Sequence, residues 1–140
     1  MRKFLDTVTP SYLESISKSK YKGKVQTGEL ATITTFSDFA FDQKGNMFIS
    51  DRLNHQIRKI DNKGNATTIA GTGESGFYGD GGPASEAAFR DPCALATDKE
   101  GNLYIADGAN NLIRKIDTKG IVSTIAGNGK HDNSGDGGPA

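Results

Sequence analysis

The chain has 140 residues, which fits one ordinary domain and leaves no room for a second of typical size. Its 17 basic and 17 acidic residues cancel, which argues against binding to nucleic acid or to an anionic membrane through bulk charge. The single cysteine, Cys93, excludes an internal disulfide, and neither a run of ~20 apolar residues nor the apolar core of a signal peptide is present. We therefore expect no membrane span and no export signal, and the composition assigns no cellular compartment.

Residues 1–35 are predicted to form a separate N-terminal segment, in which basic residues outnumber acidic ones. Ser11, with Glu14 three residues later, matches a capping box and predicts a short helix over residues 11–18. Residues 23–27 resemble residues 120–124 and are a candidate strand that closes a ring beside the last sheet of the chain. We interpret the segment as a solvated tail or a cover for a sheet face, in preference to a dock for an acidic surface.

The rest of the chain is a tandem repeat. Residues 36–84 align without gaps on residues 92–140 at a shift of 56, and 25 of the 49 aligned pairs are identical. The shared stretches include Ile-Arg-Lys-Ile-Asp, which occupies residues 57–61 and again residues 113–117. This period lies near the roughly 40–50 residues of repeats that form four-stranded propeller blades.

Each repeat contains four short runs of apolar and β-branched residues, separated by turns that carry Asp and Gly. The runs predict strands over residues 37–42, 46–51, 55–61 and 65–70, and over residues 93–98, 102–107, 111–117 and 121–126. Tight Asp-to-Gly turns join neighbouring runs, so each repeat is predicted to be an antiparallel meander. The expected fold class is all-β, with two four-stranded antiparallel blades and a short N-terminal helix.

The second repeat resembles the NHL repeat in its segments Gly-Asn-Leu-Tyr-Ile-Ala-Asp (residues 101–107) and Asn-Asn-Leu-Ile-Arg-Lys-Ile (residues 110–116). The Gly-Asp-Gly-Gly-Pro-Ala run at residues 79–84 is similar to the linker between blades in this family. The resemblance implies a β-propeller, commonly six-bladed, whose blades present binding surfaces and less often a lyase-type active site. The first repeat departs from the pattern at Phe36, where the family has Pro, and is the less regular of the two.

The repeat boundaries divide the chain into the N-terminal segment (residues 1–35), a first blade with its linker (residues 36–91) and a second blade that ends within its linker (residues 92–140). Blades bury their faces by stacking on neighbours, so two blades alone are expected to leave two apolar outer faces open. Further blades in the same polypeptide, or copies assembled into a ring, would cover these faces. We favour a piece of a longer propeller over a ring of three copies.

Several motifs that suggest chemistry are better explained by structure. Residues 71–76 match G-x-G-x-x-G, but the second repeat has Asp132 in place of the third glycine and no βαβ unit surrounds either copy. Residues 132–137 match the front of a calcium loop, whereas the first repeat has Phe77 and Tyr78 there. Roles that recur in every repeat are usually structural, so we assign Asp51 with Asn54, and Asp107 with Asn110, to turns, and Arg58 and Arg114 to ion pairs with Asp61 and Asp117 or to blade edges.

The two histidines, His55 and His131, are too few for the metal centre of a lyase-like propeller. We therefore predict no catalytic, cofactor-binding or metal-binding residue and no cofactor. Positions that differ between the repeats are better candidates for function, since propeller binding sites come from variable loops. These candidates are Arg52, His55, Phe77 and Tyr78.

The predicted function is a non-catalytic NHL-repeat scaffold that binds a protein, peptide or glycan, and binds neither nucleic acid nor membrane. The alternative is part of a six-bladed propeller enzyme of the lyase or lactonase type, whose active-site residues lie on other blades.

Overall fold

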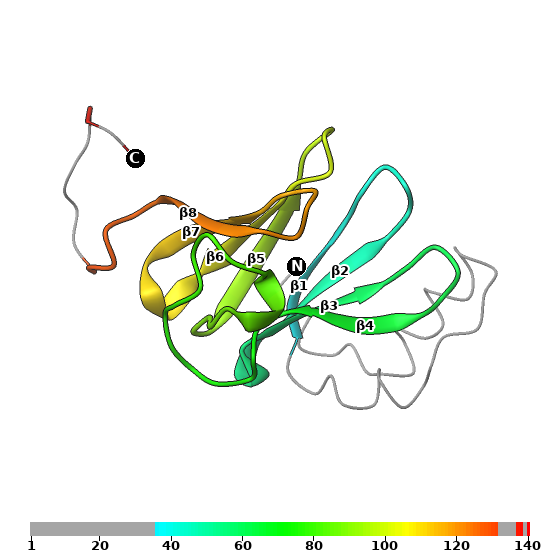
Figure 1. Ribbon diagram of the computed structural model, residues 1–140, viewed down its shortest axis with the longest axis horizontal. Helices are drawn as coiled ribbons and strands as arrows, with labels where there is room; N and C mark the ends of the chain where they lie inside the picture. Colours follow the sequence, from blue (N-terminus) through cyan, green and yellow to red (C-terminus); the bar gives the residue numbers. More distant parts are fainter. Residues whose placement is uncertain (1–35, 132–136, 139) are drawn as a thin grey trace.

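The computed structural model describes residues 36–131, 137, 138 and 140 (Figure 1). Over these residues it is all-β, with eight strands and three short 3-10 helices. The strands of the first sheet are β1 (Phe36–Phe41), β2 (Met47–Asp51), β3 (Gln56–Ile60) and β4 (Ala66–Ala70). Those of the second sheet are β5 (Pro92–Thr97), β6 (Leu103–Asp107), β7 (Leu112–Ile116) and β8 (Val122–Ala126).

Both sheets are four-stranded antiparallel meanders, which confirms the predicted fold class. The strand registers are the same in the two sheets after a shift of 56 residues. Met47 lies opposite Ile60, for example, and Leu103 lies opposite Ile116. The irregularity in the pairing of β1 with β2 recurs in the pairing of β5 with β6. The predicted helix at residues 11–18 and the candidate strand at residues 23–27 lie outside the described residues.

The Asp-to-Gly turns form because the aspartate side chain binds the backbone of its own turn. Asp61 Oδ1 accepts hydrogen bonds from the backbone N–H groups of Lys63 and Asn65, both at 2.9 Å. Gly64 has φ 88°, a left-handed conformation that glycine adopts without a steric penalty. Asp117 makes the same bonds in the second sheet. These local bonds set each turn and therefore the register of the strands that it joins.

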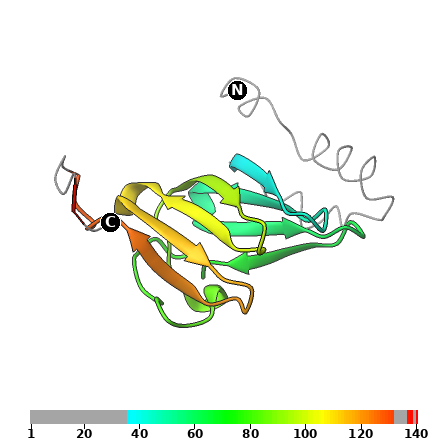
Figure 2. The same cartoon turned by 90° about the horizontal axis from the view of Figure 1, so that it is seen from above.

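The two sheets stack on one another through a shared apolar core (Figure 2). Alternation along β2 and β3 turns Phe48 and Ile57 toward the second sheet, and alternation along β6 turns Leu103 and Ile105 toward the first. The linker adds Ala84, Ala87 and Phe89 to the same core, as part of a cluster that also includes Ala70, Ile116 and Val122. Each large side chain buried in this way contributes about 1.5–3 kcal/mol relative to its exposed state.

The linker after β4 covers the outer edge of the second sheet. The backbone N–H of Gly81 donates to the carbonyl of Val122 (2.7 Å), and the N–H of Val122 donates to the carbonyl of Gly82 (3.1 Å). The N–H of Ala84 also donates to the carbonyl of Gly120 (2.9 Å). An open strand edge is a template for unwanted pairing, so these backbone hydrogen bonds from the linker protect the edge of β8.

The outer faces of the two blades differ. Met47, Ile49 and Ile60 lie on the face of the first blade that is turned away from the second, and all three are fully buried. On the corresponding outer side of the second blade, Ile113 is 37% exposed and Ile125 is 43% exposed. These three apolar residues of the first blade are therefore covered in the chain, whereas the outer face of the second blade keeps apolar side chains exposed, as expected for an open blade face.

Candidate interaction surface

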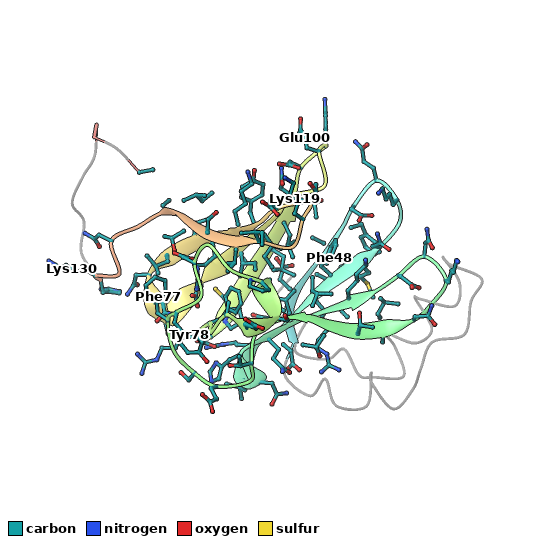
Figure 3. All side chains as sticks on the ribbon, viewed as in Figure 1. Phe48, Phe77, Tyr78, Glu100, Lys119 and Lys130 are labelled. Carbon is teal, nitrogen blue, oxygen red and sulfur yellow. The ribbon has the colours of Figure 1, made fainter. Side chains whose placement is uncertain are left out.

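The loops that join β2 to β3 and β6 to β7 lie at the same end of the two blades. Each is a single 3-10 turn, η1 (Arg52–Asn54) in the first blade and η3 (Gly108–Asn110) in the second. Both turns end in a left-handed residue, His55 with φ 56° and Asn111 with φ 55°. The linker between β4 and β5 passes this end of the blades and then forms the short helix η2 (Ala84–Glu86). We call this the loop end of the blades; the hairpin turns that carry Glu100 and Lys119 lie at the opposite end (Figure 3).

The repeated Asp and Asn pairs hold these turns together, as the sequence predicted. Asn54 Nδ2 donates to both carboxylate oxygens of Asp51, at 3.1 and 3.0 Å. Asn110 Nδ2 donates to Asp107 at 2.8 Å and also to the carbonyl of Gly76 at 2.9 Å. The second pair therefore ties the linker to η3.

Arg52 and His55 meet at Asp91, the last residue before β5. Arg52 contacts the Asp91 carboxylate through both Nε and Nη2, the latter at 2.9 Å. The hydrogen bond to Asp91, together with the charge of that carboxylate, raises the pKa of the Arg52 guanidinium. The backbone N–H of Asp91 donates to Nδ1 of His55 at 3.1 Å. Two of the four predicted site residues, Arg52 and His55, thus hold Asp91 in place at the start of the second blade.

Phe77 and Tyr78 are anchored by Arg114, which is fully buried. The Arg114 Nη1 atom donates to the buried Asp107 carboxylate at 3.0 Å, and Nη2 donates to Asp80 at 2.9 Å and to the carbonyl of Tyr78 at 3.3 Å. Its guanidinium carbon lies 4.8 Å from the ring centroid of Phe77. Arg114 was predicted to pair with Asp117 or to lie at the blade edge. Both predictions are wrong, because its side chain lies in the buried face of the second sheet, under the linker.

The two pairs of predicted residues make no hydrogen bond to one another in the described part of the chain, but η3 connects them. The backbone N–H of Gly108 donates to the carbonyl of Asp91, and that of Ala109 donates to the carbonyl of Arg90. Asn110 binds Gly76, the residue before Phe77. All four residues consequently lie at the loop end of the blades.

Three large apolar side chains are exposed at this end. Leu53 in η1 is 63% exposed, Phe77 is 51% exposed and Tyr78 is 46% exposed. Leu53 was missed by the sequence reasoning, although the alignment of the repeats contains the signal, since Leu53 faces Ala109 in the second copy. We call Arg52, Leu53, His55, Phe77 and Tyr78 the loop-end surface.

The glycine motif, the cysteine and the acidic residues give no sign of a cofactor, catalytic or metal site in the described residues. Gly71, which opens the G-x-G-x-x-G motif, has φ 92°, and a Cβ atom at this position would lie 2.3 Å from the carbonyl oxygen of His55. Burial, with a smaller contribution from Asp91, raises the pKa of the Cys93 thiol, which disfavours the reactive thiolate. Among the described residues, no group of three or more His, Cys, Asp or Glu side chains is placed to hold a metal ion.

A hollow of about 600 Å³ separates the hairpin turns of the two blades at the end opposite the loop-end surface. Phe48, Ile69 and Leu103 line its floor, and Lys59 and Glu100 lie at its rim. The rim carries charges of both signs, so it selects no ligand class. In the described part of the chain, no helix is long and apolar enough to cross a membrane.

Known proteins are similar to this chain in sequence and in fold. A family model described as the Teneurin NHL domain matches residues 73–137. Teneurin-3 of Mus musculus is 38% identical over 96 residues, which cover 59% of this chain and 4% of the relative. The protein SUPPRESSOR OF QUENCHING 1, chloroplastic, of Arabidopsis thaliana is 40% identical over 83 residues, which cover 58% of this chain and 8% of the relative. The chain thus spans less than a tenth of the length of these two relatives.

The fold is similar to a crystal structure of a structural genomics protein of unknown function from Bacteroides thetaiotaomicron. The TM-score is 0.54 and the sequence identity is 34%, over 60% of this chain and 21% of that protein. The tandem repeat, the two stacked meanders and these similarities agree. The chain is similar to NHL-repeat proteins, and its described residues form two stacked four-stranded sheets of the propeller-blade type.

Proposed function

We propose that the chain is a non-catalytic scaffold that holds a macromolecular ligand (a protein, peptide or glycan) on the loop-end surface. The observation that carries this proposal is the exposure of Leu53, Phe77 and Tyr78 at one end of the blades. Large apolar side chains that stay exposed at one end of a soluble protein are candidates for an interaction site. Aromatic and arginine side chains are also the residue types that dominate binding energy at interfaces.

The surrounding contacts support the proposal because they fix the surface before any ligand arrives. Arg114 holds the backbone of Tyr78 and stacks on the ring of Phe77, and Asp91 holds Arg52. A pre-ordered surface loses less conformational entropy when it binds, so more of the contact energy appears as affinity.

Photo-crosslinking tests the proposal. The full chain with p-benzoylphenylalanine at position 53 is expected to crosslink a macromolecular partner that the same group at position 43 does not. Position 43 is the control, because Gln43 is exposed in a hairpin turn at the opposite end of the blades. The affinity for the purified partner is then measured for the double variant Leu53→Ser, Tyr78→Ser and for Gln43→Ser.

The double variant is expected to bind at least ten times more weakly, a loss of about 1.4 kcal/mol, whereas Gln43→Ser binds like the wild type. Equal crosslinking from both positions would contradict the proposal. Unchanged affinity in the double variant would contradict it as well.

A further inference from the structure

A second hollow lies beside the loop-end surface, on the second blade. Its volume is about 420 Å³, within the range of small-molecule sites. One wall is Phe77, whose side chain is half exposed, and the remaining walls are formed by η3, Leu112 at the start of β7, Thr124 in β8 and the turn that follows β8. Gly127 and Gly129 lie in this turn, so backbone rather than side chain lines that part of the hollow.

Three polar side chains line the hollow, and each keeps one hydrogen-bonding group, a donor or an acceptor, for a ligand. Both amide N–H groups of Asn110 are engaged, by Gly76 and Asp107, which leaves its Oδ1 to accept. Thr124 donates its hydroxyl proton to Asp80 at 2.6 Å and can still accept through Oγ1. Asn128 Oδ1 accepts from the backbone N–H of Lys130 at 2.9 Å, which leaves Nδ2 to donate. The hollow therefore offers two acceptors and one donor beside an aromatic ring.

None of the described side chains that line the hollow is charged. An anionic or cationic group would lose its hydration there without gaining a counter-ion, so a neutral ligand is favoured. A pyranose ring fits this chemistry, because its hydroxyl groups both donate and accept and its C–H face packs on the negative face of an aromatic ring.

We infer that this hollow is a saccharide pocket that takes one neutral sugar ring against Phe77. The inference rests on the proposed function in that it names a ligand class for the part of the loop-end surface that contains Phe77. Phe77 forms the stacking wall, Asn110 and Thr124 accept from sugar hydroxyls, and Asn128 donates to one. Arg114 stacks on Phe77, so the wall is ordered without the sugar.

Titration of the isotope-labelled full chain with methyl glycosides of glucose, galactose, mannose and N-acetylglucosamine tests the inference. At least one of these sugars is expected to shift the backbone amide signals of Gly127, Asn128 and Gly129. Asn128→Asp keeps the acceptor for Lys130 but removes the donor and places a charge in the pocket, so it is expected to weaken sugar binding at least tenfold. Phe77→Leu keeps an apolar side chain but removes the ring and is expected to weaken binding similarly.

Gln43→Glu is the matched control, since it adds the same charge at the opposite end of the molecule and leaves sugar binding unchanged. The inference is overturned if none of the four glycosides shifts the three glycine-turn signals, or if Asn128→Asp binds as tightly as the wild type. Preference for sialic acid or for a neutral acetylated dipeptide amide over all four glycosides overturns it too. The titration uses no macromolecular partner, and crosslinking from position 53 uses no pocket variant, so either experiment can fail while the other succeeds.

Discussion

At the scale of single residues, Arg114 connects the fold to the loop-end surface. It is buried beside the carboxylate of Asp107, and its planar guanidinium reaches Asp80 and two backbone carbonyls at the same time. Only arginine combines this number of donors with a flat surface that stacks on Phe77 and Phe89. The same pair exists in the first blade, where Arg58 lies 3.5 Å from the buried Asp51.

Replacement of Arg114 by methionine is expected to lower the free energy of unfolding by about 3–5 kcal/mol, because it leaves the Asp107 carboxylate buried without its partner. Urea denaturation of the full chain measures this change. Lys115→Met is the control, since the Lys115 ammonium lies 6.0 Å from the ring centroid of Tyr104 and takes no part in the buried pair of Arg114 and Asp107. An effect of Arg114→Met no larger than that of Lys115→Met would refute the role of this arginine.

A titration probes the hairpin turn of the second blade. The Asp98 carboxylate accepts hydrogen bonds from the side chain and the backbone N–H of Asn102 and from the Tyr104 hydroxyl. These bonds, among which that of the Asn102 side chain has the largest effect, lower the pKa of the Asp98 carboxyl to about 2. The pKa in the unfolded chain is ~3.9, so the turn is stabilised above that pH and loses this stabilisation as the pH falls toward 2. Carboxyl NMR is expected to show that Asn102→Ala raises the pKa of Asp98. An unchanged value near 2 in that variant would mean that Asn102 is not the main cause.

At the scale of elements, the turns decide where strands begin and how they pair. The return from β4 into the linker requires Gly71, which has φ 92° and lies against the backbone of His55. Gly127 lies equally close to Asn111 in the second blade. A Cβ atom at position 127 would lie 2.3 Å from the carbonyl oxygen of Asn111. A turn of this kind admits no side chain.

Gly71→Ala is therefore expected to destabilise the chain more than Gly81→Ala, by at least ~1 kcal/mol in thermal or urea unfolding. Gly81 has a similar φ of 85°, but a Cβ atom there meets nothing within 4 Å. The comparison separates the clash with His55 from the cost of a left-handed alanine. Equal destabilisation by the two variants would show that the close approach at Gly71 is unimportant.

The strands could be predicted from the sequence because their signals are local. Asp and Gly at fixed spacing mark each turn, and the alternation between turns gives strand ends within one residue of those observed. The partners of Arg114 could not be predicted in this way, because Asp80 lies 34 residues away and reaches it only after the linker has folded back on the second blade. Leu53 could have been predicted, since it differs from Ala109 at the aligned position of the second repeat, but its 63% exposure depends on the three-dimensional path of η1.

At the scale of the whole molecule, the two blades and the linker share one core. Phe89 belongs to the linker and is fully buried among residues of both sheets. The contacts between β1 and β5 add to this core, as when the backbone N–H of Leu95 donates to Asp38 at 2.9 Å. Because the facing sides of the two sheets pack into this single core, we expect the blades to unfold together.

Phe89→Ala is accordingly expected to lower the free energy of unfolding by about 3–5 kcal/mol and to do so for both blades. Hydrogen exchange of the amides in β3 and β7 follows each blade separately. Protection that falls by the same free energy in both strands supports a single cooperative unit. Loss of protection in β7 alone would show two independent units.

The stacking of two four-stranded blades is the central claim, and nuclear Overhauser effects test it most directly. We predict cross-strand contacts from Met47 to Ile60 and from Leu103 to Ile116, which establish the repeated register. We also predict side-chain contacts that join Phe48 and Ile57 of the first blade to Leu103 and Ile116 of the second through their common core. Cross-strand contacts in both sheets without any contact between the sheets would contradict this account.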